Sequence, residues 1–147
     1  METFNTHTAR LKKMYESNDF NQSLAPVMDF PEPGLCEVSA GVNPVFFHGG
    51  GIMHGSIIFR LLDDACTFAA WTYVPDKMCV TKSLHIHFQK PVFRGHLRAQ
   101  GRVKEVSSSA NEIYTEGLLL NEGIEVARCT AIIARISAQF RQMPEKV

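Results

Sequence analysis

The segment GGGIMHGSIIFRLLDDACTFAA, residues 49–70, decides the fold of this chain. It opens with glycines around a histidine, and apolar residues then recur at the three-to-four spacing of one helix face. The pattern predicts one long helix that begins after the glycines and runs to the turn at Pro75 and Asp76. Its apolar arc consists of Ile57, Ile58, Leu61, Leu62, Ala65, Phe68 and Ala69.

The second half of the chain is patterned as β-strands. Between Val80 and Phe88 apolar and polar residues alternate, which is typical of a half-buried strand, and Pro91 ends it. Three further strands are predicted, joined by hairpin turns at 107–111 and 121–123, and they cover residues 97–106, 113–120 and 124–136. We expect the four strands to follow one another as an antiparallel meander.

Before the long helix the sequence predicts a short helix and a hairpin. Leu11, Met14 and Tyr15 lie at helical spacing between about residues 8 and 18, so residues 1–20 are expected to form a helical cover. Extended pieces at 25–30 and 35–42 flank a Pro-Glu-Pro-Gly turn. The whole is predicted to be one α+β domain over residues 1–147, with an antiparallel sheet wrapped around one long central helix.

Charge and composition exclude several classes of partner. Lys and Arg number 15, as do Asp and Glu, so the formal net charge is zero and no nucleic-acid partner is expected. No apolar stretch reaches the roughly 20 residues that cross a bilayer, so we expect no membrane partner and a cytoplasmic location. The four cysteines lack the C-x-x-C spacing of redox and zinc motifs, which favours buried free thiols. His85 and His87 share a strand face without a third ligand, so neither a metal site nor a cofactor is predicted.

The start of the long helix is the place best suited to chemistry. Glycines let a ligand approach the backbone closely, and the N–H groups of the first turn point at it with the positive end of the helix dipole. Such a place stabilises an oxyanion or a polarised carbonyl. The alternative is that the glycines only make a tight turn into the helix.

Asp63 and Asp64 are carboxylates in the middle of a mostly apolar helix. Asp64 flanks the apolar arc and is expected to make a local structural hydrogen bond. Asp63 lies nearly opposite the arc, on a strip that can face another helix. Either a solvated acid or a functional acid fits this position. The strip consists of Ser56, Phe59, Asp63, Cys66 and Ala70.

The spacing of Gly55 and Asp63 has a geometric consequence. Eight residues separate them, which is roughly 12 Å along a helix axis. One reacting atom about 3 Å from both cannot exist within a single chain. If a second copy packs its helix antiparallel across a two-fold axis, Gly55 of one chain meets Asp63 of the other. A catalytic role for the pair therefore requires a dimer.

Basic residues surround the strand end at Pro91 and are suited either to a solvated face or to ligand phosphates. They are Lys82, Lys90, Arg94, Arg98 and Arg102.

Three local patterns resemble the hotdog-fold acyl-CoA thioesterases of the PaaI-like, phenylacetate-degradation group. His54-Gly55-Ser56 with Asp63 nine positions after the histidine is similar to the His-Gly-Gly motif of that family. The strand VTKSLHIHFQKP at 80–91, continued by Arg94-Gly95, and the segment 123–134 resemble two further family elements. In this order the patterns cover about Leu35 to Ile136.

The resemblance implies a role for each matched residue. Asp63 would act as nucleophile or as general base for water, and the Gly55 N–H would bind the thioester oxygen. His54 would shape the loop, and Thr81 would orient water next to Asp63. It further implies an acyl-CoA substrate and a homodimer or homotetramer.

Two positions depart from the family pattern. His48 stands where many members carry Asn or Gln, and it could donate to the carbonyl or to water. Ser56 replaces the second glycine. We assign Ser56, Lys90 and Arg94 to substrate binding.

Two other functions are compatible with the same fold. The segments Phe46-Phe47-His48-Gly49 and Ile52-Met53 resemble the loop of acyl-thioester dehydratases and hydratases, but Arg60 stands where those enzymes carry a glutamate. A non-catalytic acyl-CoA-binding regulator would keep the pocket without needing an acid at position 63, so Asp63 counts against it.

Overall fold

Residues 1–137, which the computed structural model describes, fold into a six-stranded antiparallel sheet with helices on one side of it. The predicted α+β class, with an antiparallel sheet around one long helix, is confirmed. The elements are α1 (Phe4–Glu16), α2 (Asp19–Gln22), β1 (Val27–Asp29), β2 (Leu35–Gly41), a 3-10 turn (Pro44–Phe46), α3 (Gly55–Trp71), β3 (Met78–Phe88), β4 (His96–Val106), β5 (Glu112–Asn121) and β6 (Ile124–Ile136).

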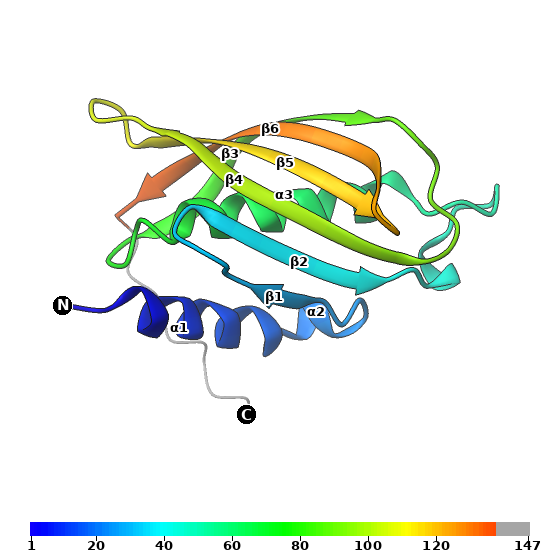
Figure 1. Ribbon diagram of the computed structural model, residues 1–147, viewed down its shortest axis with the longest axis horizontal. Helices are drawn as coiled ribbons and strands as arrows, with labels where there is room; N and C mark the ends of the chain where they lie inside the picture. The colour runs from blue at the N-terminus through cyan, green and yellow to red at the C-terminus, as the bar shows by residue number, and fades with distance from the viewer. Residues whose placement is uncertain (138–147) are drawn as a thin grey trace.

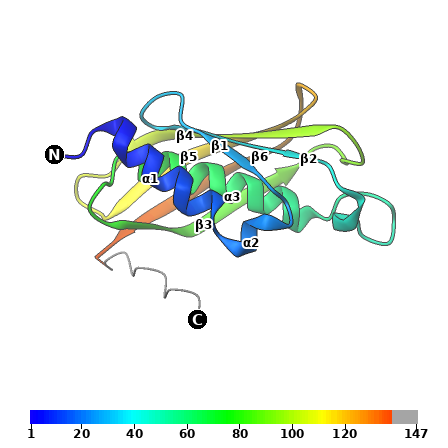
Figure 2. The same ribbon diagram turned by 90° about the horizontal axis from the view of Figure 1, so that it is seen from below.

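The helices lie in a layer beneath the sheet. In Figure 1, α3 runs under the strands and α1 lies below β1. The view from below shows α1 and α3 on the same side of the sheet (Figure 2). Leu61 and Leu62 of α3 are fully buried, as are Val38 of β2 and Ile133 of β6 on the strands that cover the helix. The core therefore lies between α3 and the sheet.

Close contact between α3 and β4 depends on Gly101. A Cβ atom at Gly101 would lie 2.1 Å from the carbonyl oxygen of Ala65 and 2.5 Å from the backbone nitrogen of Cys66. Both contacts are with helix backbone, which cannot rotate away as a side chain can. The absent side chain thus lets the helix axis approach the strand.

The strand order corrects one prediction. The sheet runs β1-β2-β4-β5-β6-β3, so only β4, β5 and β6 form a meander, and the expected pairing of the first predicted strand with the next is wrong. β3 pairs instead with β6, with His85 opposite Thr130 and Ile86 opposite Cys129. The reason is that α3 carries the chain across the sheet, while β2 and β5 occupy both edges of β4. β3 is left at the far edge, where no further strand of residues 1–137 joins it.

The N-terminal helix starts earlier than its apolar spacing indicates. Thr3 caps α1 by accepting a hydrogen bond from the Thr6 backbone nitrogen at 3.2 Å, which explains the start at Phe4. α1 buries Leu11 completely and packs the Tyr15 ring edge-on against Phe68, with ring centroids 5.2 Å apart. The short helix α2 is not predicted, because a four-residue helix is too short to show periodicity.

The four cysteines are buried and free, as predicted. In the part of the chain that the structure describes, no helix is both long and apolar enough to cross a membrane.

Candidate active site

His54 determines how α3 begins. It is the N-cap residue, and its Nδ1 accepts a hydrogen bond from the Ser56 backbone nitrogen at 3.1 Å and lies 2.7 Å from the Ser56 hydroxyl. Gly55 is the first residue of the helix, so its N–H has no intrahelical acceptor. No other acceptor within residues 1–137 takes its place. The helix start therefore presents an unused backbone donor.

Gly55 lines a pocket of about 330 Å³, together with His48, Phe88 and Lys90. A Cβ atom at Gly55 would lie 3.2 Å from the Phe88 ring, so a glycine fits the space closely. His48 Nδ1 accepts a hydrogen bond from the Gly50 backbone nitrogen at 2.9 Å. Its proton in the neutral ring is therefore on Nε2, which remains a donor. The structure thus brings three predicted site residues, Gly55, His48 and Lys90, into one pocket.

Asp63 and Thr81 meet at a second position on the same helix. The Thr81 hydroxyl donates to Asp63 Oδ1 at 2.5 Å, and the Thr67 hydroxyl lies 2.8 Å from Thr81 Oγ1. Asp63 and Thr67 come from α3, whereas Thr81 comes from β3, whose pairing with β6 is irregular between Thr81 and Ser83. Thr67 lies one helical turn after Asp63, but the sequence does not indicate that β3 packs against this face of α3 and brings Thr81 to both residues.

Asp64 has a different environment from Asp63. The Tyr15 hydroxyl of α1 donates to Asp64 Oδ2 at 2.7 Å, and Arg60 Nε lies 3.9 Å from the same oxygen. Burial raises the pKa of Asp64 to about 6, although the bond from Tyr15 and the charge of Arg60 act to lower it. The expected structural hydrogen bond is present, but it comes from another helix rather than from a local partner.

The residues exposed along α3 differ from those of the predicted strip. Cys66 and Ala70 are fully buried, because Cys66 faces β6 with its sulfur 3.7 Å from that of Cys129. Ser56 and Phe59 are exposed, and Asp63 and Thr67 are partly so. We call Ser56, Phe59, Asp63 and Thr67 the open strip of α3.

The predicted basic cluster is divided in the structure. Lys90 lines both the Gly55 pocket and an adjacent pocket of about 310 Å³ that contains Arg94 and Phe93. Lys82 instead forms an ion pair with Glu112, and Arg102 pairs with Glu32 at 3.2 Å. Only Lys90 and Arg94 of this cluster therefore line the adjoining pockets at the helix start.

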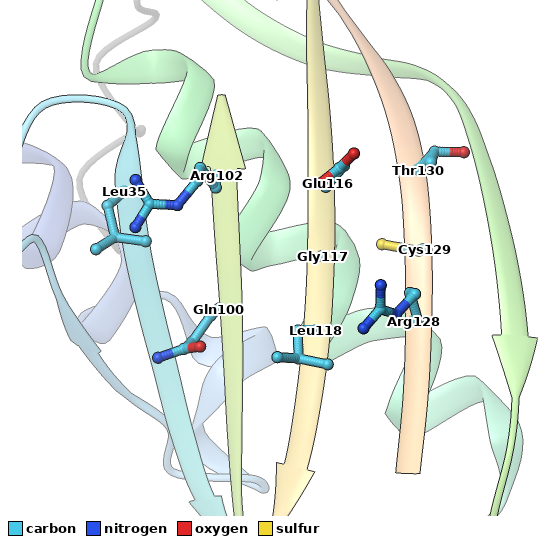
Figure 3. Close-up of a pocket in the computed structure, with 9 residues that line it drawn as sticks. All are labelled: Leu35, Gln100, Arg102, Glu116, Gly117, Leu118, Arg128, Cys129 and Thr130. Carbon is cyan, nitrogen blue, oxygen red and sulfur yellow. The ribbon is translucent and has the colours of Figure 1, made fainter. Parts of the chain in front are cut away.

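A further pocket lies on the opposite face of the sheet. It has a volume of about 490 Å³, and Figure 3 shows its arginine, glutamate and glutamine side chains on the face turned away from α3. Arg102 of the predicted basic cluster lines it, but none of the residues assigned to catalysis or to substrate binding does. On the same strand face as Thr130, the rings of His85 and His87 lie 5.0 Å apart. Residues 1–137 contain no group of three His, Cys, Asp or Glu side chains arranged to hold a metal ion.

Comparison with known proteins agrees with this architecture. Residues 50–116 match the family model of the thioesterase superfamily. The PaaI protein of the phenylacetic acid degradation operon of Escherichia coli has a TM-score of 0.82 at 21% identity, covering 94% of this chain and 99% of that chain. A thioesterase of Haemophilus influenzae has a TM-score of 0.78 at 14% identity, covering 97% of this chain and 96% of that one. The fold is the hotdog fold of these proteins.

A relative in sequence is a protein of Saccharolobus solfataricus named as an esterase. It is 29% identical over 85 residues, which is 58% of this chain. The match spans 61% of the length of that relative.

Proposed function

We propose that this chain, which matches the thioesterase superfamily over residues 50–116 and shares the hotdog fold with PaaI, hydrolyses the thioester of an acyl-CoA to a free acid and CoA. One observation carries the proposal. α3 presents an unused backbone N–H at Gly55 and, on its open strip, a carboxylate at Asp63 held by Thr81. Thioester hydrolysis needs a donor for the developing oxyanion and an activated oxygen, and these two groups are suited to supply them.

The Gly55 N–H would bind the carbonyl oxygen of the thioester. The positive end of the α3 dipole adds to this interaction, and a donor of this kind contributes roughly 3 to 4 kcal/mol to transition-state stabilisation. The Nε2–H of His48, in the same pocket, is a second donor for that oxygen or for water.

The Asp63 carboxylate would act as nucleophile or as general base for water. Its Oδ1 is held by Thr81, so Oδ2 is the atom left to attack the carbonyl carbon or to take a proton from water. As nucleophile it would form a mixed anhydride with the acyl group as the carbon–sulfur bond breaks, and water would then cleave the anhydride, with its proton passing to the CoA thiolate. As general base it would take a proton from the attacking water and pass it to the CoA thiolate as the carbon–sulfur bond breaks.

A second copy of the chain completes the site. Gly55 and Asp63 are roughly 12 Å apart along α3, so a homodimer with antiparallel α3 helices would place Gly55 of one copy against Asp63 of the other. The outer edge of β3, which no further strand within residues 1–137 joins, lies beside this face of α3, and Phe88 on that strand is 54% exposed. A homotetramer would be a pair of such dimers.

Lys90 and Arg94 would bind the phosphates of CoA at the mouth of the Gly55 pocket. The two side chains line adjoining pockets, and charged nitrogen donors are the usual partners of phosphate oxygens. Ser56, exposed at the start of the open strip, would contact the substrate beside the thioester.

A thiol-release assay with short, medium, long and aryl acyl-CoA esters tests the activity. We expect turnover of at least one class. Tight CoA binding without turnover on any ester would instead favour an acyl-CoA-binding regulator.

Subunit complementation tests the shared site. Asp63→Asn and Gly55→Pro should each inactivate the homodimer, because each lesion affects both sites. After mixing and re-equilibration, half of the dimers are mixed and each has one intact site, so about one quarter of the wild-type rate should return. A mixture that stays inactive would contradict a site built from two chains.

A further inference from the structure

Asp63 is the last of three groups linked by hydrogen bonds. Thr67 Oγ1 lies 2.8 Å from Thr81 Oγ1, which in turn lies 2.5 Å from Asp63 Oδ1. Thr67 and Asp63 are four residues apart on α3, so both face β3 from the same side of the helix. The three side chains thus form one hydrogen-bonded network between α3 and β3.

Counting the available protons shows which group donates in each of these two hydrogen bonds. A hydroxyl carries one proton, and an ionised carboxylate can only accept. The Thr81 proton is donated to Asp63, so Thr81 Oγ1 must be the acceptor in its contact with Thr67. Thr67 is therefore the donor, and the order is Thr67 to Thr81 to Asp63.

Two other threonines, Thr8 in α1 and the α3 C-cap Thr72, use their protons differently. Thr8 donates to the Phe4 carbonyl at 2.9 Å, and Thr72 donates to the Ala69 carbonyl at 2.7 Å. Such bonds to the preceding turn are the usual arrangement for a threonine in a helix. Thr67 instead turns its hydroxyl toward the neighbouring strand.

We propose that Thr67 is a positioning residue for the hydrolysis. By donating to Thr81 it fixes the rotation of that hydroxyl, so that the single Thr81 proton points at Asp63 and holds the carboxylate with Oδ2 free. This fixation matters at Thr81 because β3 is an edge strand whose pairing with β6 is irregular at this residue. The inference rests on the proposed function, since it assigns a role within the same site.

Kinetics of hydroxyl-deletion variants test this role. Thr67→Val keeps the shape of the side chain and removes the donor. We expect kcat to fall about 3- to 10-fold, the effect of one hydrogen bond on a positioned group, with KM unchanged within about two-fold. Thr67→Ser retains the hydroxyl and should restore most of the lost kcat. Thr72→Val is the matched control, because it removes a hydroxyl at the C-cap of the same helix, away from the site, and should lower Tm without changing kcat.

A double-mutant cycle separates positioning from stability. If Thr67 acts through Thr81, adding Thr67→Val to Thr81→Val should cause no further loss of kcat, whereas a purely structural effect would add to it. The proposal is overturned if Thr67→Val turns over like wild type, if Thr67→Ser is as impaired as Thr67→Val, or if the two losses multiply. Absence of turnover in the wild-type protein would overturn the proposed hydrolase function itself, and this role with it.

Discussion

The Tyr15 hydroxyl of α1 donates a hydrogen bond to Asp64 Oδ2 at 2.7 Å. The neighbouring carboxylate, Asp63, accepts its hydrogen bond from Thr81 of β3. Two acids adjacent in the sequence are therefore held by elements on different sides of α3. Asp64 ties the N-terminal helix to the core, whereas Asp63 lies on the open strip.

Replacing each acid by its amide should separate these roles. Asp63→Asn keeps the shape but removes both the nucleophile and the base, so kcat should fall at least about 100-fold with Tm close to wild type. Asp64→Asn should retain most of the activity and act on stability. The two variants are each other's control, measured by kcat/KM and thermal melting. Loss of turnover in Asp64→Asn with near-normal turnover in Asp63→Asn would place the catalytic acid one residue further along the helix.

The backbone donor of Gly55 can be removed with proline. Proline lacks the N–H and is well tolerated at the first position of a helix. His54 already has the extended conformation, φ −62° and ψ 133°, that a following proline requires. We expect Gly55→Pro to lower kcat by about 100- to 1000-fold.

Gly55→Ala is the matched control, because it adds a Cβ toward the Phe88 ring but keeps the N–H. It should retain much more activity than Gly55→Pro in the same thiol-release assay. Equal losses in the two variants would show that crowding against Phe88, and not the missing donor, limits turnover.

The buried Asp64 predicts a specific dependence of stability on pH. Its pKa is about 6 in the folded protein against an ordinary 3.8, so between these values the folded state binds more protons than the unfolded state. The free energy of unfolding should therefore fall by about 2 kcal/mol as the pH rises from 4 to 7, relative to Asp64→Asn, and level off above the folded-state pKa. Urea titrations of both proteins across this range measure the difference. A difference that grows with pH, or that stays constant, would contradict it.

The close approach of α3 to β4 predicts a severe effect of Gly101→Ala. The new Cβ would meet the backbone of Ala65 and Cys66, so α3 or β4 must shift, and we expect a loss of more than about 3 kcal/mol in the free energy of unfolding. Gly41→Ala, on the adjoining strand β2, meets no atom within 4 Å and should change stability by less than about 1 kcal/mol. Similar urea midpoints for the two variants would refute this account of the helix–sheet contact.

Much of the secondary structure could be predicted because its causes are local. The apolar spacing of residues 57–69 predicts α3, and the glycines around His54 predict where it begins. Alternation in 80–88 predicts β3 for the same reason. Which strands pair could not be predicted in this way. β3 pairs with β6 because α3 carries the chain across the sheet and β2 and β5 occupy both edges of β4.

The candidate site divides in the same way. The sequence by itself determined that Gly55 and Asp63 lie on one helix, roughly 12 Å apart, because helical rise per residue is a property of the backbone alone. Only the tertiary structure decided that Tyr15 contacts Asp64, that Thr67 and Thr81 reach Asp63, and that Cys66 is buried rather than on the open strip. These contacts depend on which elements pack against which face of α3, and packing between distant segments leaves no period in the sequence.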